Sequence, residues 1–280
     1  MGDIDGYDYG GGCIFEGEYH DTVWGTPVVD SEGLFAQLSL CTQQCGVSWR
    51  IVWNKRLHYR DAYHHWDMRK VARMSEGDLD ALCDKEGPWA GKLIQNRGKL
   101  AAIIHNARQC VQIEDSAPGG LAGFLWNFVA SPATGGSNLL EVHIAGVDGA
   151  LCVAPHYVNA ASDRHCAAYT ESFGVTSEVS GKLADVLKHK GGHAESRSFE
   201  APFKFLGSVT LQAFMLQCGL LNGHSPTCVK NPRYAKHCVA VPSPPKTTQK
   251  TKKRSAASVE EPRVARKSRT IASTTDDVWL

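Results

Sequence analysis

The chain has 280 residues, of which 42% are hydrophobic and 21% are charged, and its formal net charge is +1. It is long enough to bury a sizeable core in one or two domains, and its ten scattered cysteines show no dense disulfide framework. Residues 1–12 lack the features of a signal peptide and no apolar stretch could span a bilayer, so we expect a cytoplasmic or nuclear protein without a membrane partner.

Residues 30–66 carry the first predicted helices. Asp30 or Ser31 can cap a helix that ends at Gly46, and Ser48 begins a second helical stretch. Apolar residues at helical spacing support both stretches. They are Leu34, Phe35, Leu38, Cys41 and Cys45 in the first, and Trp49, Val52, Trp53, Leu57 and Tyr63 in the second.

More helices are predicted downstream. Ser75 and Asp78 give the Ser-x-x-Asp start of a capping box. Helical periodicity also covers residues 100–111, 121–128, 180–192 and 208–219. Few runs alternate with a period of two, and hairpin signals are sparse. The sequence therefore predicts an all-α fold of the helical-bundle type.

Two stretches depart from this pattern. Residues 130–180 are rich in Gly, Ser and Pro with weak periodicity, which predicts a partly disordered insertion. The helical domain then spans residues 13–239, between a flexible segment at 1–12 and a tail at 240–280.

The tail is basic. Residues 246–280 hold nine Lys and Arg and four Asp and Glu, a net charge of +5, which leaves −4 on residues 1–245. With few apolar residues, burial cannot offset the entropy lost on ordering, so we expect disorder. The clusters at 252–254 and 266–269 suit nuclear import, if the chain is eukaryotic, or weak contact with nucleic acid. The alternative is a solvated tail without a dedicated partner.

Histidine and cysteine occur near both ends of the predicted domain. His224 and Cys228 form a His-x-x-x-Cys unit, short enough for both side chains to reach one ion. Cys13 and His20 can supply two more ligands for a tetrahedral zinc ion. The alternative is a buried cysteine and a polar surface histidine with no metal.

Several motifs occur in an informative order. They are YHDTVWG at 19–25, TQQCGVSW at 42–49, NRGKLAAIIHNARQ at 96–109 and FKFLGSVTLQAFMLQCGLLNGHSPTC at 203–228. Together they resemble the DNA-3-methyladenine glycosylase I family over residues 13 to about 130 and about 180 to 228. The resemblance implies an all-helical protein of the helix-hairpin-helix glycosylase superfamily. It also implies a monomer that excises 3-methyladenine from alkylated double-stranded DNA in base excision repair.

The same resemblance implies a structural zinc ion that joins the two ends of the domain. His20, His224 and Cys228 match ligand positions directly. Cys13 stands closer to the YHD motif than the family's first cysteine does, and we retain it as the fourth ligand. His237 and Cys238 are the alternatives.

The resemblance further implies a pocket for a flipped, cationic base. An electron-rich aromatic cage favours a cation, and Tyr19, Trp24 and Trp49 match cage or cage-proximal positions. The alternative is that these aromatic residues pack in the hydrophobic core. For Trp24, both the pocket and the core interpretation stay open. Cys41 occupies the position of the family's Glu, which hydrogen-bonds the excised base, and a thiol accepts such bonds weakly. A thiolate with a lowered pKa would restore some negative charge.

DNA contact is expected at residues 91–99, where the family has a hairpin between two helices. Backbone N–H groups and a helix N-terminus there can hold phosphates, with Gly91, Lys92, Arg97 and Lys99 as the contact residues. The alternative is a solvated turn. Two other functions compete with excision: a catalytically weakened damage-binding protein and a zinc-stabilised helical interaction module.

Overall fold

A computed structural model describes residues 18–130, 140–142, 151–153, 156–157, 176–188 and 201–224. The predicted flexible segment at 1–12 and the tail at 240–280 lie outside these residues. So does most of the predicted insertion at 130–180, of which only Ala130, three short strands and residues 176–180 are described.

The described chain is mostly helical, which confirms the helical fold. The helices are α1 Glu18–Thr22, α2 Ser31–Gln43, α3 Trp49–Asn54, α4 Arg56–Ala62, the 3-10 turn η1 His64–Trp66, α5 Met68–Ala72, α6 Glu76–Cys83, α7 Arg97–Ser116, α8 Gly120–Ala130, α10 Glu178–Lys188 and α11 Ser208–Gln217. The all-α prediction missed short strands: β1 Leu140–Val142 pairs antiparallel with β2 Leu151–Val153, and β3 His156–Tyr157 pairs parallel with β4 Leu221–Asn222.

Helix ends follow the capping signals in the sequence. The Asp30 side chain accepts a hydrogen bond from the backbone N–H of Gly33 at 2.7 Å and so caps α2, and Ser75 and Asp78 form the predicted capping box of α6. The cap of α10 is Ser177, whose hydroxyl accepts from the N–H of Ser180 at 3.2 Å. The predicted start at Ser180 was therefore one turn late.

The second helical stretch is interrupted. It divides into α3 and α4 and ends at His64, His65 and Trp66, which all have positive φ values of 52–66°. Non-glycine residues pay a steric cost in this left-handed region. Trp66 is buried and packs edge-on against Phe35 at a centroid distance of 6.1 Å. Burial of this indole in the core is the favourable term that opposes the backbone cost.

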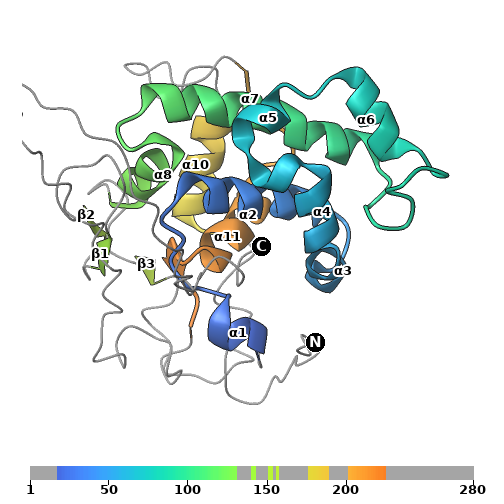
Figure 1. Ribbon diagram of the computed structural model, residues 1–280. Coiled ribbons are helices and arrows are strands. Elements are labelled where there is room, and N and C mark those ends of the chain that lie inside the picture. Colours follow the sequence, from blue (N-terminus) through green and yellow to red (C-terminus); the bar gives the residue numbers. More distant parts are fainter. Residues whose placement is uncertain are drawn as a thin grey trace, which may run out of the picture.

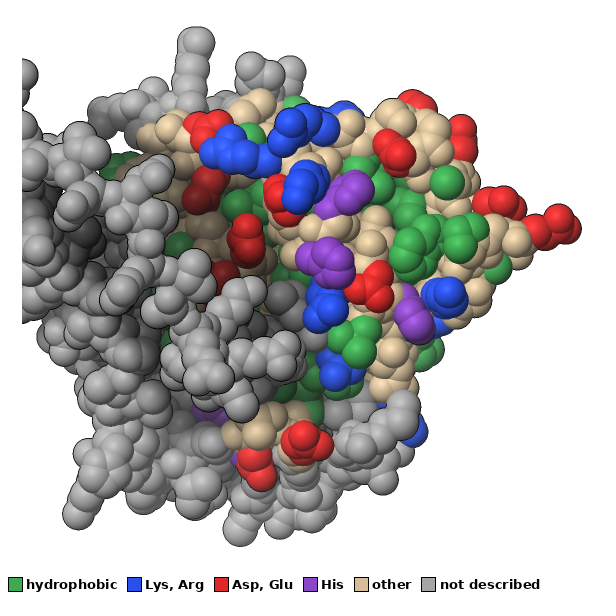
Figure 2. All heavy atoms as spheres, viewed as in Figure 1, with side chains coloured by type: hydrophobic (Ala, Val, Ile, Leu, Met, Phe, Trp, Pro, Cys, Tyr) green, Lys and Arg blue, Asp and Glu red, His purple; other side chains and the backbone are tan. Residues whose placement is uncertain are grey.

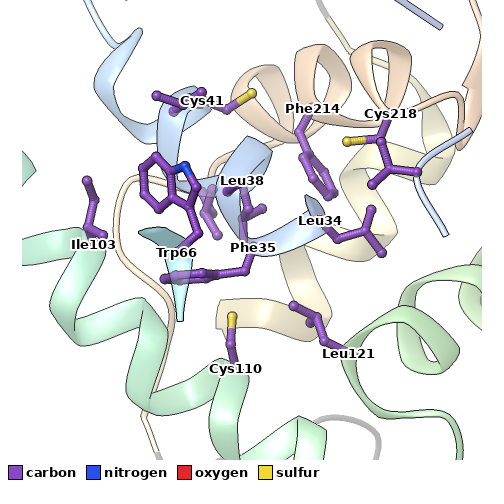
Figure 3. Close-up of a cluster of buried hydrophobic side chains, with 14 of the residues drawn as sticks. Leu34, Phe35, Leu38, Cys41, Trp66, Ile103, Cys110, Leu121, Phe214 and Cys218 are labelled. Atoms are coloured by element: carbon purple, nitrogen blue, oxygen red, sulfur yellow. The ribbon is translucent and has the colours of Figure 1, made fainter. Parts of the chain in front are cut away.

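Helix α2 forms the centre of the bundle. It packs against α7, α8 and α11, and α10 packs against α11. In Figure 1, α7 runs along the top, α2 crosses the middle, and α11 and then α1 lie below it. Figure 3 shows side chains from these helices converging in one core. The labelled members are Leu34, Phe35, Leu38 and Cys41 of α2, Trp66 of η1, Ile103 and Cys110 of α7, Leu121 of α8, and Phe214 and Cys218 at α11. In the described residues, no helix has both the length and the apolar character needed to cross a bilayer.

Candidate functional site

Two predicted metal ligands, 204 residues apart, meet in the structure. His20 Nε2 of α1 lies 3.2 Å from His224 Nδ1, and both side chains are buried. Two nitrogens bound about 2.0–2.1 Å from a tetrahedral zinc ion lie roughly 3.3 Å apart. The other ring nitrogen of His20, Nδ1, lies 2.8 Å from the Asp21 carboxylate, the outer contact that fixes a ligating imidazole. The 3.2 Å separation is that of a direct hydrogen bond between the two rings, and it also equals the spacing of two nitrogen ligands on one zinc ion.

The remaining predicted ligands, Cys13 and Cys228, and the alternatives His237 and Cys238 lie outside the described residues. Among the residues that are described, no cluster of three or more His, Cys, Asp or Glu could hold a metal ion. The zinc site therefore remains a prediction; of its four proposed ligands, the described residues include His20 and His224, which lie side by side.

Backbone contacts join the two ends of the described chain beside these histidines. The N–H of Gly25 donates to the carbonyl of Gln217 at 3.1 Å, and the N–H of Val28 donates to the carbonyl of Cys218 at 3.0 Å. Gly25 has a φ of +72°, and a Cβ there would lie 2.6 Å from Nε2 of His224. The glycine of the YHDTVWG motif is therefore required both by its backbone conformation and by its closeness to His224.

Trp24 belongs to this junction. Its ring stacks on His20 at a centroid distance of 5.9 Å and meets His224 edge-on at 4.9 Å. It is 1% exposed. Of the two readings left open for Trp24, the structure supports packing around the histidine pair.

Tyr19 and Trp49 lie together in a separate aromatic cluster. Their ring centroids are 6.3 Å apart, and Trp53 lies 4.7 Å from Tyr19 and 6.1 Å from Trp49. Burial raises the pKa of Tyr19 well above its usual value, so the phenol is neutral. Trp53 was not among the predicted cage residues. Its position four residues after Trp49, on the same face of one helix, was the available signal.

Cys41 lies at the interface between α2 and α11 and is fully buried. Burial raises the pKa of its thiol, because the charged form is disfavoured away from water. The suggestion that a thiolate replaces the family's carboxylate is therefore wrong. The neutral Sγ lies 3.2 Å from Oε1 of Gln217, and Nε2 of Gln37 donates a hydrogen bond to the same oxygen. Sequence reasoning found neither glutamine, since they are 180 positions apart.

The predicted DNA-contact segment lies between α6 and the N-terminus of α7. Gly91, Lys92 and Arg97 are exposed. Lys92 lies over the Trp89 ring at 5.8 Å, and the Arg97 guanidinium pairs with Asp80 and Glu76. Figure 2 shows Lys and Arg side chains interspersed with Asp, Glu and His on the face that it displays.

Lys99 differs from its neighbours in this segment. It is 7% exposed, and its ammonium donates to the backbone carbonyls of Gln43, at 3.0 Å, and Cys45. These carbonyls close the C-terminal end of α2, where a cation is favourable. The side chain of Lys99 is therefore engaged inside the protein, and this geometry removes it from the predicted phosphate contacts.

Comparisons with known proteins agree on one family. The methyladenine glycosylase family matches residues 15–143. The DNA-3-methyladenine glycosylase of Haemophilus influenzae is 32% identical over 211 residues, which cover 75% of this chain and 89% of the relative. DNA-3-methyladenine glycosylase 1 of Escherichia coli is 32% identical over 212 residues, covering 75% and 88%.

Solved structures give the same result. A crystal structure of 3-methyladenine DNA glycosylase I aligns with a TM-score of 0.55 and 32% identity, over 76% of this chain and 92% of that one. A structure of the Staphylococcus aureus enzyme, described for its recognition of 3-methyladenine, aligns with a TM-score of 0.54 and 29% identity, over 78% and 90%.

Proposed function

This chain belongs to the DNA-3-methyladenine glycosylase family, and from that premise we propose that it excises 3-methyladenine from alkylated double-stranded DNA. The observation that carries the proposal is the cluster of Tyr19, Trp49 and Trp53, which brings three aromatic rings together. Methylation at N3 makes the adenine cationic, and aromatic faces attract a cation. Such a base must leave the duplex stack to reach these rings.

The chemistry follows from the labile bond of the substrate. The oxygen of a water molecule bonds to C1′ of the sugar, and the C1′–N9 bond breaks. Its electron pair goes to the cationic base, which departs as neutral 3-methyladenine, and the water's proton passes to solvent. The neutral thiol of Cys41 is a poor nucleophile, so we assign it no covalent role.

We assign DNA contact to Gly91, Lys92, Arg97 and the exposed N-terminus of α7. Backbone N–H groups at a helix start bind phosphate without reading sequence. Arg97 already pairs with two carboxylates, and a phosphate would take the place of one of them. This arrangement matches an enzyme that must search DNA of any sequence.

We also assign a structural zinc ion to His20 and His224, with Cys13 and Cys228 as the further ligands. The ion would link α1 to the segment after α11, and four protein ligands leave no open position for a water molecule. The support is the spacing of the two imidazole nitrogens and the contact between His20 and Asp21.

A second candidate function is a damage-binding protein with weakened catalysis. It is motivated by the neutral Cys41 at the position of the family's carboxylate. The two functions separate in one assay: the full-length chain is incubated with methylated DNA, and released bases are identified by mass. Release of 3-methyladenine supports the glycosylase. Salt-sensitive binding to methylated DNA without release supports the damage-binding protein.

Variants of Trp49 test the pocket itself. Trp49→Ala should lower the rate of 3-methyladenine release while the protein remains folded, since one aromatic face is lost, and Trp49→Phe should keep most of the rate. If folded Trp49→Ala releases the base as fast as the unmodified chain, Trp49 is a core residue and the pocket assignment is wrong.

A further inference from the structure

A short segment without regular structure, residues 201–206, is bound to α7. Asn106 of α7, which is 1% exposed, donates a hydrogen bond to the carbonyl of Lys204 at 2.9 Å and accepts one from its N–H at 2.8 Å. The side chains of Phe203 and Leu206 are buried in the core. These contacts hold the backbone of the segment in one conformation.

Phe205, within this segment, has a backbone conformation that most residues avoid. Its φ is +57°, in the left-handed region, where a side chain has a steric cost that glycine does not have. Trp66 also has a positive φ, but it is 1% exposed, and its burial opposes that cost. Phe205 is 43% exposed, so burial offsets less of the cost there. A strained residue that surrounding contacts hold in place is a candidate for a functional role.

The Phe205 ring lies beside the first turn of α7. Its Cζ atom is 3.8 Å from the position that a Cβ of Gly98 would take. Asn96 caps this helix by accepting a hydrogen bond from the N–H of Lys99 at 3.1 Å. The first N–H groups of a helix, here those of Arg97 and Gly98, have no partner within it. The ring therefore adjoins the helix end to which we assign DNA phosphates.

Cationic side chains stand near the exposed ring. Lys204, directly before Phe205, is exposed, and its ammonium forms no ion pair with a carboxylate of the described residues. Arg97 lies at the start of α7, next to Gly98. An apolar ring beside cations fits a partner that presents anionic and apolar surface together. A DNA duplex does so, with phosphates at the rims of its minor groove and with sugar faces and base edges inside it.

We propose that Phe205 enters the minor groove of the DNA whose phosphates the N-terminus of α7 holds, and that its ring packs there against sugars and base edges. The proposal rests on the proposed function and adds an apolar contact to its DNA interface. Because the segment 201–206 already holds the ring in an exposed position, little conformational freedom is lost when DNA binds. The contact carries no charge, so it adds affinity that does not depend on salt.

The test replaces Phe205 by the residue that its backbone conformation favours. Phe205→Gly removes the ring and also removes the steric cost of the left-handed conformation, so Tm should stay the same or rise. Val209→Ala is the matched control, because it removes exposed apolar atoms from α11 instead, where Val209 is 54% exposed. The dissociation constant for a short duplex without alkylated bases is measured over a range of salt concentrations, together with Tm.

For Phe205→Gly, the dissociation constant should rise roughly 10- to 50-fold, the effect of burying the exposed part of one aromatic ring. The slope of log affinity against log salt concentration should stay the same, because no charge is lost. Phe205→Leu should keep most of the affinity, and Val209→Ala should leave it nearly unchanged. An unchanged dissociation constant in Phe205→Gly, an equal rise in both Phe205→Gly and Val209→Ala, or a shallower slope overturns the inference.

Thermal unfolding distinguishes a DNA contact from a packing role. If Phe205 mainly packs against α7, Phe205→Gly should lower Tm, and any weaker DNA binding would follow from the less stable fold. A clear fall in Tm for Phe205→Gly therefore overturns the inference, whereas weaker binding with Tm preserved supports it.

The same measurements separate failure of the inference from failure of the proposed function. Binding to a duplex without alkylated bases does not require excision, so weaker binding by Phe205→Gly supports the inference even if the unmodified chain releases no base. If the unmodified chain releases 3-methyladenine and Phe205→Gly binds DNA equally well, the inference is wrong and the proposed function stands. If the unmodified chain does not bind duplex DNA at low salt, both are wrong.

Discussion

The burial of Lys99 predicts that its side chain stabilises the fold, whereas its position in a basic segment suggests that it binds DNA. Its ammonium donates to the carbonyls of Gln43 and Cys45. A hydrogen bond to a charged group contributes about 1.5–3 kcal/mol. Lys99→Met keeps the unbranched stem but removes both bonds, so the free energy of unfolding should fall by about 3 kcal/mol or more. For a domain of about 200 residues, this corresponds to a decrease in Tm of roughly 6–12 °C.

The comparison is with Arg97→Ala, two residues away. The Arg97 side chain is 51% exposed, so its loss should leave Tm nearly unchanged. If Arg97 meets a phosphate, the slope of log affinity against log salt concentration should become shallower by about 0.9. Lys99→Met should leave that slope unchanged.

Two measurements decide the matter: thermal unfolding of each variant, and binding to a short duplex over a range of salt concentrations. The reasoning fails if Lys99→Met has the Tm of the unmodified chain and a shallower salt dependence of DNA binding. The ammonium would then contact a DNA phosphate rather than stabilise the end of α2.

Two further predictions concern the metal and pH. One zinc ion per chain should be found by elemental analysis; His224→Ala should lose it, while the exposed His65→Ala keeps it, and chelation should lower Tm because a structural metal contributes to folding. Zinc-free protein that is folded contradicts the site. The free energy of unfolding should also fall as pH rises above about 9–10. Burial raises the pKa values of Cys41 and Tyr63 and raises that of Tyr59 to about 12. The stabilisation from keeping these groups protonated is present below their pKa values in the unfolded chain and is lost as pH rises through their pKa values in the folded protein. Tyr59 alone accounts for about 2 kcal/mol by pH 12. Denaturant unfolding at pH 8–11 should therefore show a shallower decline for Tyr59→Phe, and identical declines would refute this.

Local signals predicted the helices well. Asp30, Ser75 and the spacing of Leu34, Phe35 and Leu38 give α2 and α6 because caps and apolar stripes act within one or two turns. The break at His64–Trp66 could not be predicted, since burial of Trp66 against Phe35 outweighs a local backbone cost.

In the candidate site, too, some features could be predicted from the sequence and others depend on tertiary packing. His20 and His224 were grouped as metal ligands by residue type, and the resemblance strengthened this hypothesis, because their spacing in sequence carries no information about contact. The sequence suggested Lys99 as a phosphate ligand because it lies in a basic segment at the place of the family's hairpin. Only the packing of α7 on α2 turns the side chain inward. The pairing of Gln37 with Gln217 depends on how α2 packs against α11, and no local sequence signal predicts that packing.

Gln217 shows why the two ends of the chain matter to the proposed pocket. Its backbone carbonyl binds the N–H of Gly25, and its side-chain amide binds Gln37 and Cys41. Gln217 thus links the junction that carries His20 and His224 to the polar group around Cys41. Tyr19 lies directly before His20, so the junction also sets the place of that ring. A zinc ion at the histidine pair would then act on the base through position alone, by fixing the backbone that presents the Tyr19 ring beside Trp49.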